Sequence, residues 1–276
     1  MSEQWTVAGP RVIEVGGEGD VPKEVRIRLV GGHASVVAQD DLDSVRVEVS
    51  AVKGRDLIVT WSHGVLEISH PSLKWENLFE GFRTYFGRED RAEVSVAVPR
   101  SVVVRLGTVT GDGLVSGTNL PAHVKTVSGR IIVDGVHGHV DAKTVSGSIE
   151  VRDQHGVFTG DTVSGSLTVQ AVAMPQLRAK SVSGSLSIDL GTAPATLAAT
   201  TVSGDVTVRV PADSGFDVDA KTVSGEVVAG GERLAGKPGN NGGRISRGDK
   251  AVHLVAKTVS GDVTLLHADA AEGGRA

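Results

Sequence analysis

The sequence predicts an all-β protein: a right-handed β-solenoid of about 18-residue coils, with a β-rich N-terminal region and a short capping helix. Three observations indicate this fold. One tetrapeptide recurs at nearly constant spacing, apolar and polar residues alternate around each copy, and the chain has 36 glycines but only 3% aromatic residues. Such a composition favours strands joined by tight turns, with a core of Val, Ile, Leu and Ala.

The repeat is the tetrapeptide Thr/Ser-Val-Ser-Gly. It begins at Thr126, Thr144, Thr162, Ser181, Thr201, Thr222 and Thr258. A near copy begins at Thr108, and the successive spacings are 18, 18, 18, 19, 20, 21 and 36 residues. A fixed period of this size indicates stacked structural units. The last spacing is twice 18, which suggests one further repeat without its signature within residues 226–250.

Each unit alternates with the period of two that is expected of a strand. Apolar residues fall on even positions up to Ala220 and on odd positions from Val223 onward. Because a strand keeps its phase unless a bulge or corner interrupts it, we expect a break at Lys221-Thr222. This placement predicts an inward column of the motif valines: Val109, Val127, Val145, Val163, Val182, Val202, Val223 and Val259. The motif glycine is expected where φ is positive or where a Cβ would clash.

Two architectures fit these units. In a solenoid each unit is one coil, and equivalent residues stack about 4.8 Å apart. In an antiparallel sandwich or meander each unit is a hairpin. The near-constant length and the fixed place of the motif favour the solenoid.

The N-terminal region, residues 1–100, lacks the motif but shows strand patterns, with turn signals that include Gly31-Gly32. The expected strands are Glu24–Val30, Ala34–Val37, Val45–Val49, Leu57–Trp61 and Val65–Ser69. Aromatic residues at helical spacing then predict a helix over 73–87. Since an open solenoid end exposes strand edges, this helix is either a cap or a surface for a partner protein or membrane, presented by Trp75, Phe79, Phe82 and Phe86. The repeat solenoid spans 101–266, with a Gly-rich loop at 230–249, and 267–276 is expected to be a disordered tail.

A column of lysines directly precedes the motif and is the candidate interaction face. Its members are Lys125, Lys143, Lys180, Lys221 and Lys257. Asp161 and Thr200 interrupt the series, which relieves repulsion between stacked like charges. With the Thr and Ser hydroxyls expected beside these lysines, the sequence indicates a binding module or scaffold whose regular face meets a protein or glycan partner. A self-assembling rod and an adhesin-like surface protein are the alternatives, and the oligomeric state is left open.

The sequence carries no catalytic, nucleotide or cofactor motif, and we expect a protein that is not an enzyme and has no cofactor. The chain has no cysteine, and with a net charge of −5 it lacks the basic character of a nucleic-acid-binding protein. His137, His139 and His155 fall where stacked coils could gather them around Zn²⁺, although surface histidines in turns explain the same pattern. No metal site is therefore predicted.

The N-terminal residues precede no apolar segment typical of a signal peptide, and no run of 18 apolar residues predicts a membrane span. We expect a cytoplasmic location, and a non-classical export route would leave no trace in these patterns.

The Thr-Val-Ser-Gly units that follow a strand-rich N-terminal third resemble a bacterial family of β-strand repeats catalogued as "putative adhesin" domains of unknown function. The resemblance covers about residues 20–266 and is carried by all seven copies of the motif. It implies a β-helical repeat domain without known catalytic residues.

Overall fold

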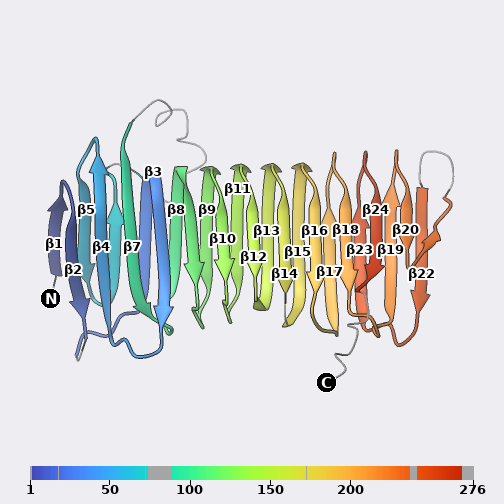
Figure 1. Cartoon of the computed structure of the whole chain (residues 1–276), viewed down its shortest axis with the longest axis horizontal. Helices are drawn as coiled ribbons and strands as arrows, with labels where there is room; N and C mark the ends of the chain where they lie inside the picture. Colours follow the sequence, from blue (N-terminus) through green and yellow to red (C-terminus); the bar gives the residue numbers. More distant parts are fainter. Residues whose placement is uncertain are drawn as a thin grey trace, which may run out of the picture.

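The computed structural model describes residues 2–17, 19–71, 73, 89–171, 173–236 and 241–268. These residues form a long rod of strands that lie across its axis, with the N-terminal strands at one end and the last turns of the repeat near the other (Figure 1). The described residues include no helix. The predicted helix over 73–87, together with Trp75, Phe79, Phe82 and Phe86, lies outside the described residues except for Leu73.

The N-terminal region and the first coil contain nine strands. They are β1 (Ser2–Val7), β2 (Arg11–Gly16), β3 (Glu24–Gln39), β4 (Ser44–Lys53), β5 (Leu57–Ser62), β6 (Val65–Ser69), β7 (Arg91–Pro99), β8 (Val103–Ser116) and β9 (Ala122–Ser128). The middle coils contain β10 (Ile131–Asp134), β11 (Val140–Ser146), β12 (Ile149–Arg152), β13 (His155–Ser164), β14 (Leu167–Ala171), β15 (Ala173–Ser183), β16 (Leu186–Leu190), β17 (Ala195–Thr200) and β18 (Val206–Val210). The last part contains β19 (Phe216–Thr222), β20 (Val227–Ala229), β21 (Glu232–Arg233), β22 (Asn241–Arg247), β23 (Val252–Lys257) and β24 (Val263–His267).

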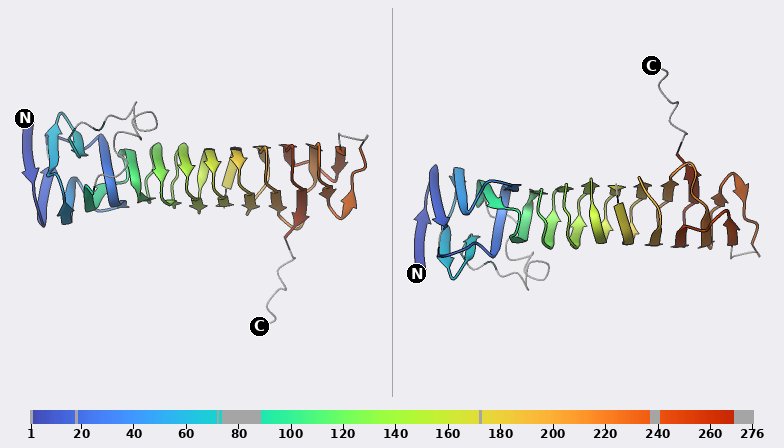
Figure 2. Two further views of the ribbon diagram at one scale, coloured as in Figure 1. Left: turned by 90° about the horizontal axis from the view of Figure 1, so that it is seen from above. Right: turned by 90° about the horizontal axis from the view of Figure 1, so that it is seen from below.

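The strands form two ladders, because each coil contributes one strand to each. The first ladder runs β1–β5–β6–β3–β8–β9–β11–β13–β15–β17–β23–β19–β22. The second runs β2–β4–β7–β3–β8–β10–β12–β14–β16–β18–β24–β20–β21. The long strands β3 and β8 turn the corner and belong to both. Figure 2 shows the two layers of the rod from above and below.

The pairing confirms the predicted solenoid over the antiparallel alternative. All pairs from β3 through β19 in the first ladder, and from β7 through β20 in the second, are parallel. Antiparallel strands close both ends of each ladder: β1 and β2 at one end, β22 and β21 at the other. Each 18-residue step in sequence therefore advances the chain by one strand spacing along the rod.

Two features of the N-terminal region differ from the sequence prediction. Gly31-Gly32 is not a turn between two strands, because β3 continues through it. At Gly32 the backbone has φ +105°, and a Cβ there would lie 2.1 Å from the carbonyl oxygen of Ala92. Two glycines thus let one strand turn the corner between the ladders while its backbone lies against that of Ala92. In the sequence, the same glycine pair resembles a turn that reverses the chain. Strands β1 and β2 precede the first predicted strand.

The end of the repeat is not threaded in sequence order. The last coil, β23 and β24, lies between the coil of β17 and β18 and the coil of β19 and β20. The described residues between Thr222 and Thr258 therefore form no extra coil of the repeat. Residues 230–249, expected to be a loop, include β21 and β22, which cap the far end before the chain returns to fill the gap.

The core fills the space between the ladders with aliphatic side chains. In β11, for example, Val140 and Ala142 are fully buried, and in the facing strand β12 so are Ile149 and Val151. Each such valine or isoleucine stabilises the fold by about 1.5–3 kcal/mol. Because the coils present the same positions in register, the core is continuous along the rod.

Candidate functional site

The corner formed by the motif decides which residues face solvent, and it differs from the prediction. The even-numbered inward phase of β19 continues through Thr222, which is fully buried, while Val223 is half exposed. The break in phase therefore lies at the Val-Ser-Gly corner and not at Lys221-Thr222. The motif Thr or Ser faces the core in every coil, at Thr108, Thr126, Thr144, Thr162, Ser181, Thr201, Thr222 and Thr258.

The buried hydroxyls form an internal column with uneven hydrogen bonding. The Thr108 hydroxyl lies 2.7 Å from the carbonyl oxygen of Gly111 and 2.9 Å from the Thr126 hydroxyl, which donates to the same carbonyl at 3.2 Å. Near the far end, Thr222 donates to the carbonyl of Gly261 at 3.0 Å. In the middle of the rod, the hydroxyls with no hydrogen-bond partner among the described residues are Thr144, Thr162, Ser181 and Thr201. The hydroxyls at the first motif position, expected on the outside, thus form a buried column, and of the two expected hydroxyl columns the motif serine column faces solvent.

The motif glycines form a second column, in which successive backbones touch. A Cβ at Gly147 would lie 1.9 Å from the carbonyl oxygen of Gly129, and one at Gly165 would lie 1.9 Å from that of Gly147. Real Cβ atoms do not approach backbone oxygen this closely, so no larger residue fits without moving a coil. The predicted reason for the motif glycine is confirmed.

The motif valines form a column on the outer face of the first ladder, and it has two parts. Val109 and Val127 are buried, and with Val30 they pack against Leu73 in a small cluster outside the main core, which Val145 borders. Beyond this point the column is open: Val163, Val182, Val202, Val259 and Val223 are 47–50% exposed. The predicted inward column is therefore wrong. Val109 and Val127 point away from the main core and are covered by Leu73, and the five later valines face solvent.

Backbone hydrogen bonds fix the order of the open column. The amide of Ser203 donates to the carbonyl of Val182 at 2.8 Å, that of Ser260 donates to Val202 at 2.9 Å, and that of Ser224 donates to Val259 at 2.9 Å. The inserted last coil thus places Val259 between Val202 and Val223. We call the five exposed residues the valine column: Val163, Val182, Val202, Val259 and Val223.

The predicted lysines lie on this same outer face, two residues before each valine. In spatial order the column reads Lys125, Lys143, Asp161, Lys180, Thr200, Lys257 and Lys221. Lys143 lies 3.4 Å from Asp161, and Lys221 lies 3.7 Å from Asp219. Lys180 and Lys257 form no ion pair with another described residue, and Thr200 separates them. The structure therefore gathers the lysines into one column, as the sequence indicates, and sets the valine column beside it.

A carboxylate on the same face balances part of this charge. Burial raises the pKa of Asp141, but the nearby His123 ring, 3.9 Å away, and the charge of Lys143 outweigh that effect, so its pKa lies below the usual value. Asp141 therefore stays ionised and, together with Asp161, offsets the charge of Lys143. In the open half, Lys221 pairs with Asp219, whereas Lys180 and Lys257 form no ion pair with another described residue.

The histidines do not gather as a metal site would require. His137 stacks on His155 with ring centroids 4.4 Å apart, and His155 contacts Asp153 at 3.1 Å. His139 lies instead beside His123, with centroids 6.5 Å apart. Within the described ranges no three His, Cys, Asp or Glu side chains are placed to hold a metal ion.

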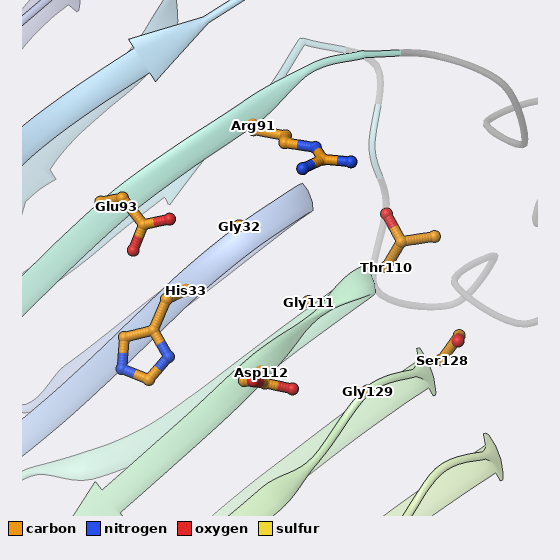
Figure 3. A pocket seen from close by; sticks show the side chains of 9 residues that line it. All are labelled: Gly32, His33, Arg91, Glu93, Thr110, Gly111, Asp112, Ser128 and Gly129. Atoms are coloured by element: carbon orange, nitrogen blue, oxygen red, sulfur yellow. The ribbon is translucent and has the colours of Figure 1, made fainter.

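A shallow hollow of about 400 Å³ lies at the corner where β3, β7 and β8 meet. Figure 3 shows Arg91 on β7, His33 on β3 and Asp112 on β8 along its wall. His33 pairs in register with Glu93 on one side and with Asp112 on the other. The hollow is lined by side chains of positive and of negative charge, and the Asp112 carboxylate already accepts a hydrogen bond from the backbone amide of Arg130 at 2.7 Å. The hollow therefore lacks the repeating character of the outer face.

The ends of the segment that contains the aromatic residues are held together by Arg55. Its side chain donates to the carbonyl of Pro71 at 3.2 Å and to Asp90 at 2.9 Å, and its backbone amide donates to Asp90 at 2.9 Å. Next to this clamp, His70 is fully buried and accepts a hydrogen bond from the amide of Val30 at 3.1 Å. Burial lowers the pKa of His70 to about 4, so the ring is neutral at pH 7.

The sequence contained a signal for the exposed valines. Continuing the even-numbered phase of each strand by one more step places the motif Thr inside and the Val outside. The alternative, a break before the Thr, agreed with hydrophobicity alone and therefore gave the wrong face.

No helix in the described part of the chain is long and apolar enough to cross a bilayer.

Comparison with known proteins places these features in a family. The family model described as Toastrack DUF4097 matches residues 27–266. None of the curated proteins matches the chain.

Three solved structures are similar in arrangement. A "putative cell adhesion protein" from Clostridium sporogenes has 11% sequence identity, with 94% of this chain and 100% of that chain covered and a TM-score of 0.27. A "Putative lipid binding protein" from Parabacteroides distasonis has 14% identity, coverage of 95% and 97%, and a TM-score of 0.48. A "putative adhesin" from Bacteroides fragilis has 10% identity, coverage of 93% and 97%, and a TM-score of 0.35.

Proposed function

The chain belongs to the Toastrack DUF4097 family, and we propose that it is a non-enzymatic binding scaffold whose outer first-ladder face meets a macromolecular partner. The observation that supports this is the open valine column beside the lysine column. Half-exposed valines recur in five adjacent coils, next to ammonium groups of which two form no ion pair with another described residue. A contiguous apolar stripe with a polar border is typical of an interaction surface.

The repetition itself suits binding rather than catalysis. Each coil offers nearly the same groups in the same place: an inward Thr or Ser, an outward Val and, in most coils, an outward Lys. A reaction centre needs different groups that converge on one point. A row of equal groups instead offers the same contact several times along a line, which suits an elongated partner.

The experiment is a pull-down from extracts of the source cell, with the intact chain as bait. The test variant reverses the lysine column to glutamate: Lys125, Lys143, Lys180, Lys221 and Lys257. A matched control reverses to glutamate five exposed cationic residues that lie elsewhere: Arg11, Lys23, Lys53, Arg91 and Lys250. We expect a partner that is retained by the parent and the control but lost from the test variant, with circular dichroism showing that all three are folded. Equal recovery on all three baits would contradict the proposal.

A further inference from the structure

The open valine column is one residue wide and several coils long. With stacked coils about 4.8 Å apart, five valines extend for about 19 Å along the rod. Its borders are polar on both sides: lysine positions precede the valines, and the exposed motif serines follow them at Ser164, Ser183, Ser203, Ser260 and Ser224. The shape and chemistry of this stripe limit what can cover it.

The area of the stripe is too small for a second rod. Five half-exposed valines offer at most a few hundred Å² of apolar surface. A stable protein–protein interface buries about 800 Å² of polar and apolar surface on each partner, so a second rod would also have to bury the polar borders of the stripe. A narrow apolar line is therefore better matched by a single secondary-structure element.

An α-helix fits this line. A helix advances 5.4 Å per turn, so its apolar residues at i, i+4, i+7 and i+11 recur at nearly the spacing of the coils. Over the length of the column, the positions of the helix side chains and of the valines differ by about 2 Å, which flexible side chains such as Leu can absorb. An added β-strand would need a free strand edge, whereas this surface is the face of a ladder.

The chain already shows how the column accepts an apolar side chain. Leu73, which belongs to no strand, is 3% exposed and packs on Val30, Val109 and Val127 in the covered part of the same column. The open part continues this contact surface coil by coil. An occupant with Leu-like side chains would extend a packing arrangement that the protein uses within itself.

The charges at the border select the flank of the helix. Lys180 and Lys257 form no ion pair with another described residue, and Lys221 pairs with the half-exposed Asp219, at 3.7 Å. All three precede valines of the column by two residues, and therefore lie on the same side of it. Carboxylates on one flank of the helix would meet them.

From these observations, and resting on the proposed function, we propose that the valine column binds an amphipathic α-helix whose apolar stripe is flanked on one side by acidic residues. The valines supply the apolar contact. Lys180, Lys257 and Lys221 set the orientation and discriminate against basic helices.

The test uses a designed 16-residue helical peptide with Leu at i, i+4, i+7 and i+11 and Glu on one flank, carrying a fluorophore. A second peptide has Lys at the Glu positions. Fluorescence anisotropy is measured with the full chain at low salt. We expect saturable binding of the Glu peptide and at least tenfold weaker binding of the Lys peptide.

Two variants and one control locate the binding. The triple variant Val182→Ser, Val202→Ser and Val259→Ser is expected to weaken binding of the Glu peptide at least tenfold. Val12→Ser is the control, because Val12 is 50% exposed on a distant strand, and it should leave binding unchanged. The pair Lys180→Glu and Lys257→Glu should reverse the preference between the two peptides. All changes are at solvent-facing positions, and thermal melting confirms that each variant is folded.

Several results would overturn the inference. These are equal binding of both peptides, unchanged affinity in the triple variant, or binding to phosphatidylglycerol vesicles in place of the peptide. A concentration-dependent dimer that the serine variant abolishes would assign the column to a second copy instead. If the peptide fails but the pull-down still depends on the lysine column, only the helical partner is refuted; if both fail, the proposed scaffold function is refuted as well.

Discussion

The sharpest test of the stacked-coil architecture is the substitution Gly147→Ala. A Cβ at this position would lie 1.9 Å from the carbonyl oxygen of Gly129, which is more than 1 Å inside normal contact. The two coils can separate only by stretching the backbone hydrogen bonds between them, such as Ile131 to Ser148 at 2.9 Å and Gly135 to Arg152 at 3.2 Å.

The expected magnitude follows from these contacts. Overpacking costs about 1–3 kcal/mol, and each weakened backbone hydrogen bond adds about 1 kcal/mol. We therefore expect a loss of about 3 kcal/mol in the free energy of unfolding. With an unfolding entropy of about 2.1 cal/mol/K per residue, this lowers Tm by about 5 °C.

The assay is thermal and denaturant unfolding followed by far-UV circular dichroism. Gly243→Ala is the matched control, because nothing lies within 4 Å of its added Cβ. This substitution should be neutral or slightly stabilising, since alanine restricts the unfolded chain more than glycine does. If Gly147→Ala melted like its control, the glycine column would not be in contact and the architecture would be refuted.

Three further predictions concern the corner and its surroundings. Thr201→Val should stabilise the fold by about 1 kcal/mol, because it removes a buried hydroxyl that has no hydrogen-bond partner among the described residues. Thr126→Val should destabilise the fold by a similar amount, because it loses the hydrogen bond to the Gly111 carbonyl. Denaturant unfolding measures both changes. Val202→Asp, at a half-exposed position, should change the free energy of unfolding by less than about 1 kcal/mol. Val208→Asp places a charge in the core and should cost more than about 4 kcal/mol by the same measurement. Equal effects of the two substitutions would contradict the assigned faces. The pKa of His70, about 4 in the folded chain and about 6.5 when unfolded, makes the unfolded state bind more protons between these values. Stability should therefore be complete above pH 6.5 and fall by up to about 3 kcal/mol as pH drops to 4; a His70→Gln variant with the same pH dependence as the parent would refute this.

Sequence patterns alone determined the repeat unit and the class of fold. The motif at near-constant spacing, together with alternation on both sides, predicted parallel coils, and the glycine of the motif predicted a close approach of backbones. These predictions succeeded because the coil length and the period of a strand are local properties. The lysines were also placed in one column, since equal spacing in sequence becomes register in a solenoid.

Other features depended on the tertiary structure. Whether Thr222 or Val223 faces the core depends on where the corner breaks the alternation, and a hydroxyl is buried there because the coil above supplies a carbonyl, Gly261, to receive it. The insertion of the last coil between two earlier ones is invisible to spacing, because strand pairing ignores chain order. The split of the motif valines into a covered and an open part arises from Leu73, a residue distant in sequence, which packs onto one end of the column. Local periodicity fixes the unit that repeats, but only contacts between distant segments decide which of its faces remains in water.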